Sequence, residues 1–284
     1  MVTITDYTPE LTNISKSVLL ELMTTLKSYS NAFVLIGGWA PYFILERFKE
    51  PENKFEHIGS IDIDLAINPA MIDARKYASI VELITKRGYT PRLDRVGNII
   101  PFSFERTITV NKEEYAISVD FLSTEYNMLI EKKHRHRRIQ PDLLARTMHG
   151  CEIVLDHYFE HEITGILPGD GEITIRLKVA DVVGAITTKG IVLGERYNEK
   201  DAYDIYVVIA NYKNGPRSVA EEVRPYLDNK LIKEAIENIE ERFTDIKSPG
   251  PSWVANFFSG DEETRKRRIT DAFMNVSEFL RLIR

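Results

Sequence analysis

The chain has a single cysteine and no run of apolar residues long enough to cross a membrane. One cysteine excludes an internal disulfide and a cysteine-based zinc site, so we expect Cys151 to be a small buried apolar residue. A membrane helix needs about 20 mostly apolar residues, and the start of the chain lacks the basic and apolar regions of a secretory signal. We therefore expect a cytoplasmic protein that has no membrane partner.

Positive charge is also scarce, with 37 Lys and Arg against 43 Asp and Glu and a formal net charge of −6. This balance disfavours a protein coated in positive charge for gripping long nucleic acid. The exception is the basic block at residues 132–138, Lys-Lys-His-Arg-His-Arg-Arg. We expect a solvated loop there, and the alternative is a binding segment for a triphosphate or an RNA backbone.

Apolar periodicity in the first part of the sequence predicts a mixed β-sheet with flanking helices. Strands are expected at 32–36 and 60–67, and hairpins are expected at 99–123 and 152–179. The first hairpin has its connection at 111–114, and the second has its turn at 168–171. Helical spacing marks residues 11–29, 39–48 and 72–87.

The remainder of the chain has helical spacing, and helices are expected at 180–193, 201–212, 218–243 and 262–283. Pro249-Gly250-Pro251 is expected to interrupt them. The predicted fold class is therefore α+β, with a sheet domain at 1–179 followed by a mainly α-helical domain at 180–284.

Two acidic residues stand one position apart in the predicted strand at 60–67. In Ile61-Asp62-Ile63-Asp64-Leu65, the two-residue period of a strand puts both carboxylates on one face and the three apolar side chains on the other. Two neighbouring anions on a fixed backbone repel each other unless a cation lies between them. A solvated strand face is the alternative reading of this pair.

A third carboxylate and a glycine pair complete the pattern. Asp120 lies inside a predicted strand, where an unsatisfied buried acid costs several kcal/mol. Magnesium takes hard oxygen ligands and is commonly held by one or two carboxylates together with substrate phosphates. Gly37-Gly38 ends a strand before a helix, where backbone N–H groups approach a phosphate closely. We expect Asp62, Asp64 and Asp120 to hold two Mg²⁺ ions, with a phosphate group at the glycines.

The order of these motifs resembles that of the DNA polymerase β-like nucleotidyltransferase superfamily. That pattern has a strand, Gly-Gly, a helix, an acid-x-acid strand and a third acid on a later strand. The matching segments here are Leu35-Ile36-Gly37-Gly38-Trp39-Ala40, Gly59-Ser60-Ile61-Asp62-Ile63-Asp64-Leu65 and Ser118-Val119-Asp120-Phe121. The resemblance implies a nucleotidyltransferase fold over residues 30–125, with catalytic roles for Asp62, Asp64 and Asp120.

Residues 185–189, 195–196 and 200–206 extend the resemblance to the abortive-infection (AbiEii-type) nucleotidyltransferase toxins. It implies that Lys189 meets the nucleotide phosphates and that Asp201 is needed for activity, so both are expected to contribute from the helical domain. It also implies nucleotide contacts by Gly37, Gly38, Ser60, Lys189 and Arg196. Asp204 shares a helix face with Asp201, where the alternative is a solvated surface.

The resemblance implies a Mg²⁺-dependent transfer of a nucleoside monophosphate from an NTP to a hydroxyl acceptor. RNA, tRNA or a protein is the implied acceptor, and an antitoxin protein is an implied partner. Gly-Gly-Trp-Ala is also similar to aminoglycoside and lincosamide nucleotidyltransferases, so a small-molecule acceptor is an alternative. A non-catalytic nucleotide-binding module is another. Trp39 itself is expected in the core, and His157 and His161 are not expected to bind metal.

Overall fold

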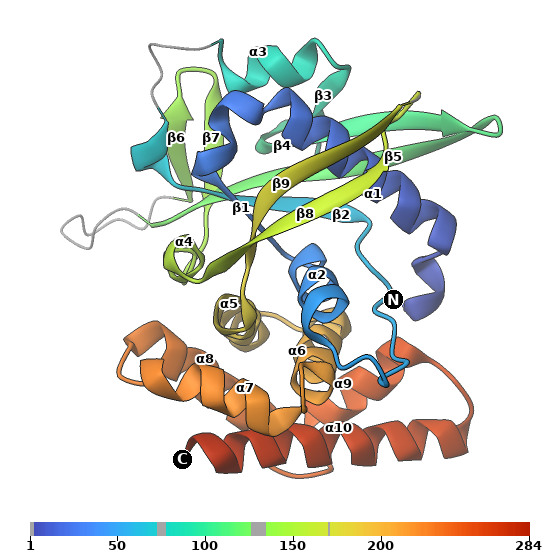
Figure 1. Ribbon diagram of the computed structural model, residues 1–284, viewed down its shortest axis with the longest axis vertical. Coiled ribbons are helices and arrows are strands. Elements are labelled where there is room, and N and C mark those ends of the chain that lie inside the picture. Colours follow the sequence, from blue (N-terminus) through green and yellow to red (C-terminus); the bar gives the residue numbers. More distant parts are fainter. Residues whose placement is uncertain (1–2, 73–77, 126–134, 170) are drawn as a thin grey trace. The chain divides into compact units, whose positions relative to one another are not determined.

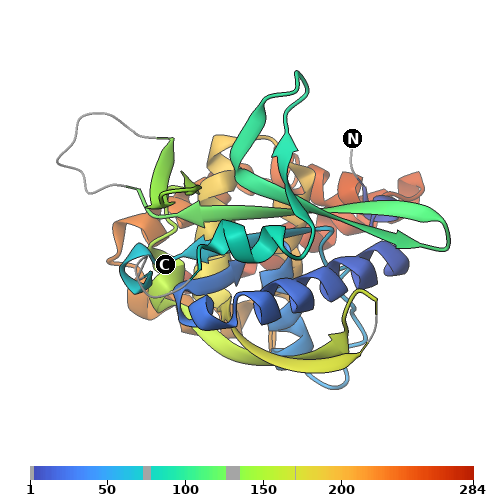
Figure 2. The ribbon, with the colours of Figure 1, turned by 90° about the horizontal axis from the view of Figure 1, so that it is seen from above.

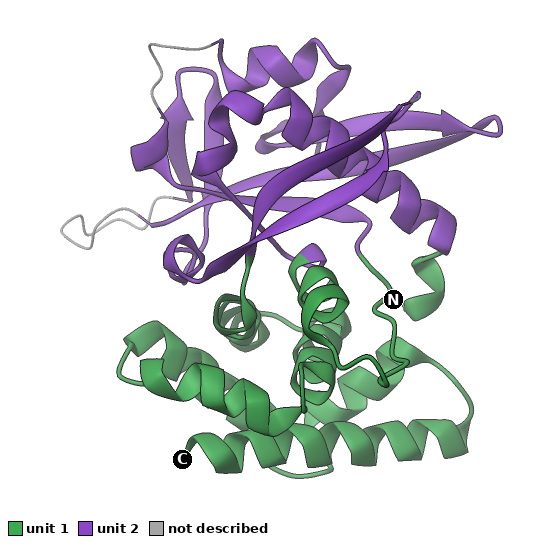
Figure 3. Ribbon diagram, in the orientation of Figure 1, with its two compact units in different colours: residues 1–8, 40–59, 180–284 green, residues 9–39, 60–179 purple. Residues whose placement is uncertain are grey.

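The computed structural model describes residues 3–72, 78–125, 135–169 and 171–284. Its contacts divide the chain into two compact units (Figure 3). Unit 2 comprises residues 9–39 and 60–179, and unit 1 comprises residues 1–8, 40–59 and 180–284. The chain is an α+β protein with a mixed sheet and helices, followed by a mainly helical C-terminal region, which confirms the predicted fold class (Figure 1).

The described part of unit 2 is built on a nine-stranded mixed sheet in the order β3-β4-β5-β2-β1-β9-β8, with β7 pairing β5 and β6 pairing β7. The strands are β1 (Phe33–Ile36), β2 (Asp62–Ile67), β3 (Tyr89–Leu93), β4 (Ile99–Val110), β5 (Glu113–Ser123), β6 (His136–Gln140), β7 (Leu143–Thr147), β8 (Tyr158–Ile166) and β9 (Glu172–Ala180). The strands β3, β6 and β7 were not predicted from the sequence.

Strand β2 lies inside the sheet and has one apolar face. It runs antiparallel to β1 and parallel to β5. Ile63, Leu65 and Ile67 alternate along it and are fully buried. Helix α1 (Pro9–Thr25) contacts both β2 and β5 and buries Val18 and Leu19 completely. Figure 2 shows α1 running along the sheet. Because alternate strand residues point to opposite faces, the polar residues of β2 face away from this core.

Two predicted elements of unit 2 differ in the structure. The helix expected at 72–87 is shorter, because α3 (Ile80–Thr85) begins only after Ser79, whose hydroxyl accepts a hydrogen bond from the Glu82 N–H. Residues 73–77 of that prediction lie outside the described residues. The hairpin of β4 and β5 is tighter than predicted, because Asn111 and Lys112 take positive φ angles and form a two-residue turn.

The segment before the second hairpin also departs from the prediction. Residues 152–179 contain a short helix, α4 (Ile153–Asp156), before β8 and β9 form the expected hairpin. The basic block was expected to be a loop, but its described end runs into β6, and residues 132–134 lie outside the described part of the chain. Cys151 is fully buried as predicted, and burial raises the pKa of its thiol to about 12.

Unit 1 consists mainly of helices: α2 (Trp39–Phe48), α5 (Val182–Glu195), α6 (Glu199–Asn211), α7 (Pro216–Val223), α8 (Lys230–Arg242), α9 (Pro249–Phe258) and α10 (Glu262–Ile283). The helix predicted at 218–243 is two helices, because Pro225 ends the first segment and Asn229 caps α8 through the Leu231 N–H. Pro249 was expected to interrupt the helices, yet it opens α9, where its missing N–H costs nothing. Over the residues described, no helix is both long and apolar enough to span a bilayer.

Candidate active site

The pairing of β2 with β5 puts the three predicted catalytic aspartates on one face of the unit 2 sheet. Asp64 is the direct register partner of Asp120, and Asp62 is the partner of Ser118. Residues opposite each other in a parallel pair point to the same side, and neighbouring strands lie about 4.8 Å apart. Asp62 lies two residues before Asp64 and therefore faces the same way. The strand register thus brings together the carboxylates that the sequence singled out.

Two of these carboxylates are held by serine hydroxyls. Ser60 is buried, and its Oγ donates a 2.5 Å hydrogen bond to Oδ1 of the exposed Asp62. Ser103 on β4 is the register partner of Asp120 and donates a 2.5 Å bond to its Oδ1. Ser60, which the resemblance assigned to the nucleotide, thus contacts one of the predicted metal-binding carboxylates. Ser103 was missed, because only the β4–β5 register reveals it.

Asp120 is a stronger base than an ordinary aspartate. Burial is the main reason that its pKa is raised, and the nearby charge of Asp62 raises it further. The Ser103 hydrogen bond and the guanidinium groups of Arg92 and Arg146 act in the opposite direction but do not outweigh burial. A half-buried carboxylate of this kind can accept a proton from a bound hydroxyl.

Gly37 lies directly against the carboxylate of Asp64. Ile36 at the end of β1 is the register partner of Asp64, and Gly37 follows with a φ of +65°. A Cβ atom at Gly37 would lie 2.0 Å from Asp64 Oδ2, which is far inside van der Waals contact. Glycine is therefore required here both by the backbone angle and by the close approach. Gly38 follows it and is buried immediately before α2.

The donor set on this face suits magnesium. Within the residues described, no three His, Cys, Asp or Glu side chains form a ready-made metal cage. Magnesium does not need one, because it is usually bound by one or two carboxylates, waters and substrate phosphates. The aspartates offer hard oxygen donors on neighbouring strands, and the Asp64 carboxylate lies directly against the Gly37 backbone. This face therefore fits a magnesium ion that is completed by a substrate.

The predicted residues Lys189 and Asp201 lie in unit 1, in a buried ionic network. The Lys189 ammonium on α5 lies 2.9 Å from Asp201 Oδ1 and 2.6 Å from Asp204 Oδ2, both on α6. The three side chains are 13%, 3% and 0% exposed, respectively. The alternative of a solvated helix surface is therefore wrong for both aspartates. Two of the three ammonium N–H groups are directed at these carboxylates, which leaves one donor for another group.

Two further cations complete this network. Arg196, which the resemblance assigned to the nucleotide, donates to Asp201 Oδ2 from Nε at 3.2 Å and from a terminal nitrogen at 3.1 Å. Its side chain remains 54% exposed. Lys200 lies 3.1 Å from Asp204 one helical turn away. Burial opposes a charged Lys189, but Asp201 and Asp204 outweigh it and raise the pKa of the ammonium. Lys189 and Lys200 likewise overcome burial and lower the pKa of Asp204.

His57 is a member of the network that the sequence did not reveal. The Gly59 N–H donates to its Nδ1 at 3.0 Å, so Nδ1 is the acceptor and the ring proton lies on Nε2. Nε2 then donates to Asp204 Oδ1 at 3.2 Å. Burial lowers the pKa of His57 and outweighs the effect of Asp204, so the ring is neutral near pH 7. The segment before Gly59 reads as a charged loop, and nothing in its pattern marks a buried histidine.

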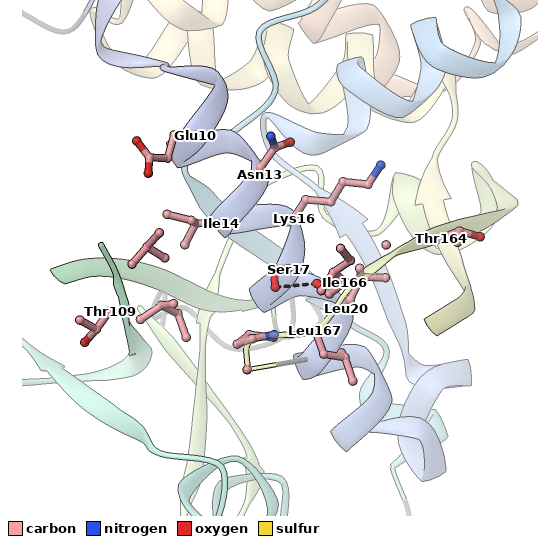
Figure 4. A pocket seen from close by; sticks show the side chains of 15 residues that line it. Glu10, Asn13, Ile14, Lys16, Ser17, Leu20, Thr109, Thr164, Ile166 and Leu167 are labelled. Atoms are coloured by element: carbon pink, nitrogen blue, oxygen red, sulfur yellow. Dashed lines mark hydrogen bonds between the residues drawn. The ribbon is translucent and has the colours of Figure 1, made fainter. Parts of the chain in front are cut away.

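The remaining predictions lie elsewhere. Trp39 is fully buried, as expected of a core residue. His157 follows α4 and His161 lies within β8, so they do not share a helix face. A pocket of about 800 Å³ in unit 2 opens between α1, the end of β4 and the tip of the β8–β9 hairpin (Figure 4). Ser17 donates a hydrogen bond to the Ile166 carbonyl at its edge. None of the predicted site residues lines this pocket.

No protein-family model, no curated protein and no solved structure matches the chain.

The close approach of Gly37 to Asp64 is tested by comparing Gly37→Ala with Gly97→Ala. Both glycines have positive φ angles, at +65° and +89°, but a Cβ at Gly97 would meet nothing within 4 Å. Both variants pay the cost of the left-handed backbone, so the difference isolates the contact with the carboxylate. We expect Gly37→Ala to unfold with a free energy about 1–3 kcal/mol below that of Gly97→Ala in urea titrations. Equal losses would contradict the close approach.

The buried network predicts a large stability effect at Lys189. Lys189→Met leaves two buried carboxylates without their shared cation, and we expect a loss of about 3–5 kcal/mol in the free energy of unfolding. The control is Lys233→Met, because the exposed pair of Lys233 and Glu237 should contribute less than about 1 kcal/mol. Similar losses from both variants, measured by chemical denaturation, would show that the network does not stabilise unit 1.

His57 predicts a pH dependence of stability. In the folded state the pKa of His57 lies below the usual 6.5. On acidification, His57 is therefore protonated in the unfolded chain before it is protonated in the folded chain, which favours unfolding. The wild type should therefore lose stability below about pH 6.5, by up to about 1.4 kcal/mol per pH unit from this residue. His57→Gln removes the titrating group, and its stability should fall less steeply between pH 7.5 and 5.5. Parallel pH profiles for the two proteins would disprove the assignment.

Proposed function

We propose that the protein is a Mg²⁺-dependent nucleotidyltransferase, with the nucleotidyltransferase fold, whose reaction takes place on the aspartate-bearing face of unit 2. The observation that carries the proposal is the register of β1, β2 and β5. It aligns Ile36 with Asp64 and Asp64 with Asp120. The turn Gly37-Gly38, which we call the glycine elbow, therefore lies next to the carboxylates. The motifs that resemble those of the DNA polymerase β-like superfamily thus lie on neighbouring strands of the sheet.

The glycine elbow provides the phosphate side of this arrangement. Gly37 lies against Asp64 without a side chain, and Gly38 follows it at the N-terminal end of α2. The N-terminal end of a helix presents unpaired N–H groups and a partial positive charge, both of which favour a phosphate. A triphosphate bound there would have its charged oxygens next to the aspartates. Bound magnesium would offset that charge and increase the acidity of the acceptor hydroxyl.

Asp120 supplies the proton acceptor. Its pKa is raised mainly by burial, and Ser103 fixes one of its oxygens. The acceptor oxygen attacks the α-phosphorus of the NTP while its proton passes to Asp120. The bond between the α-phosphorus and the bridging oxygen breaks, and pyrophosphate leaves with the bonding electrons. The acceptor then carries a nucleoside monophosphate.

Further parts of the proposal rest on the resemblance to the AbiEii-type toxins. These are the roles of Lys189 at the nucleotide phosphates and of Asp201 in activity, an RNA, tRNA or protein acceptor, and an antitoxin partner. The support for Lys189 in the unit 1 network is that two of its three ammonium N–H groups are used by Asp201 and Asp204, so the third can donate to a phosphate. Arg196 remains a nucleotide-binding candidate because half of its side chain is exposed.

The proposal is tested by removing the carboxylates one at a time. Asp62→Asn, Asp64→Asn and Asp120→Asn should each lower magnesium-dependent transfer from a labelled NTP to total cellular RNA or protein by at least about 100-fold. The control is Glu114→Gln, an exposed carboxylate at the other end of β5, which should keep full activity. Circular dichroism and thermal unfolding establish that each variant is folded. Unchanged transfer in folded Asp62→Asn and Asp64→Asn proteins would rule out the proposed site.

A further inference from the structure

Two exposed arginines lie beside Asp120 and belong to none of the motifs discussed above. Arg92 is on β3, and Arg146 is on β7. Both are exposed, and the positive charge of each acts on the Asp120 carboxylate. In the part of the chain that the structure describes, neither guanidinium has a hydrogen bond or an ion pair. Two available cations therefore flank the proposed proton acceptor in a chain with a net charge of −6.

The sheet order places both arginines on one side of Asp120. Running from the glycine elbow, the strands are β1, β2, β5, β4 and β3, so Arg92 lies beyond Asp120. Strand β2 pairs with β5 as far as Ser123, so β2 occupies one edge of β5 at that end. Strand β7 pairs with the same end of β5, at Leu122 and Ser123, and must therefore use the other edge. Arg146 thus also lies on the side of β5 away from Gly37.

The register supports the orientation of Arg146. Leu122 is its direct partner in a parallel pair, and Leu122 lies two residues after Asp120. Opposed residues of a parallel pair share a face, and so do residues two apart on a strand. Arg146 therefore points to the face that carries Asp120. Arg92 lies close to Asp120 along the sheet. Its neighbour Pro91 pairs with Phe104 on β4, and the residue before Phe104 is Ser103, which donates a hydrogen bond to Asp120.

Arg92 is presented from an ordered hairpin. The Asp94 carboxylate accepts hydrogen bonds from the N–H groups of Val96 and Asn98, each at 2.9 Å. A second Asp94 oxygen accepts a 3.1 Å bond from the Asn98 amide. These bonds order the turn that connects β3 to β4, and Arg92 lies two residues before Asp94 on β3. A side chain on an ordered backbone loses less conformational entropy on binding than one on a loose loop.

We propose that Arg92 and Arg146 bind a phosphate group of the acceptor and so place its hydroxyl beside Asp120. This inference deepens the proposed function and rests on it, because it takes Asp120 as the residue nearest the acceptor hydroxyl. The nucleotide phosphates are assigned to Gly37 on the opposite side of the aspartates. The arginines therefore serve the second substrate, and they are binding residues rather than residues that transfer protons.

The chemistry of the guanidinium group defines the class of acceptor. Arginine binds phosphate oxygens through paired N–H donors, and such charge-assisted bonds are stronger than neutral ones. A polycationic amino sugar would instead meet two like charges beside Asp120, which disfavours the aminoglycoside alternative. The acceptor class is a hydroxyl compound with a phosphate near the reacting oxygen. A phosphodiester of a polynucleotide and the phosphate of a small sugar phosphate both meet this description.

Binding without magnesium tests the arginines apart from catalysis. Wild type, Arg92→Gln, Arg146→Gln and the control Arg95→Gln are titrated calorimetrically with a dinucleoside monophosphate, a sugar monophosphate and an uncharged nucleoside. Arg95 is a matched control because it is exposed on the same hairpin and is not among the charges that act on Asp120. We expect Arg92→Gln and Arg146→Gln each to weaken phosphate binding roughly tenfold or more. Arg95→Gln should change it by less than about twofold, and binding of the nucleoside should be unaffected. Comparing the two phosphate compounds shows which source is preferred.

Transfer kinetics with the same compounds separate the two substrates. The arginine variants should raise KM for the phosphate-bearing acceptor and leave KM for the NTP unchanged, and Arg92→Lys should recover part of the loss. Equal phosphate binding by all four proteins, or a raised KM for the NTP alone, overturns the inference. Arginine-dependent phosphate binding without any transfer by the wild type refutes the proposed function but leaves the anion site in place.

Discussion

The parallel pairing of β2 with β5 is the constraint on which the candidate site depends. It sets Asp64 beside Asp120, while the buried side chains of Ile63 and Leu65 hold β2 in this register. A shift of one residue would turn the apolar side chains outward, so the core fixes the position of the acids. The repulsion between them is reduced by serine hydroxyls and by charges at the edge of the group. The buried apolar side chains of β2 thus keep the aspartates close together although their charges repel each other.

In unit 1, buried charged side chains are paired with charges of the opposite sign. Its buried charges include partners of both signs, with Lys189 and Lys200 against Asp204, and with His57 contributing a neutral donor. Desolvating ions is expensive, and the expense is offset only when each ion meets well-placed partners. Such a network fixes helix α5 against α6 in one arrangement, because sliding either helix would leave a charge alone.

The sequence predicted what depends on local periodicity. Strand β2, the glycine elbow and the bounds of α10 follow from patterns that one segment carries by itself. What it could not predict depends on partners that are distant in the chain. Ser103 meets Asp120 only through strand register, and His57 is buried by residues some 150 positions later. The edge strands β3 and β6 are only five residues long; β3 is mostly exposed and β6 is mostly half-buried, so neither shows the alternation that marks a strand with one buried face. Pro249 was misread because proline both ends helices and begins them.

The lone sulfur of Cys151 gives the molecule an internal reporter. Its thiol is fully buried and its pKa is about 12, so the reactive thiolate is almost absent while the surrounding structure stays closed. Alkylation therefore requires an opening event in unit 2. Because the chain contains no other cysteine, the labelling rate measures the frequency of that opening without any engineered probe. A ligand that binds the aspartate-bearing face and tightens the sheet would slow the reaction of a sulfur it never touches.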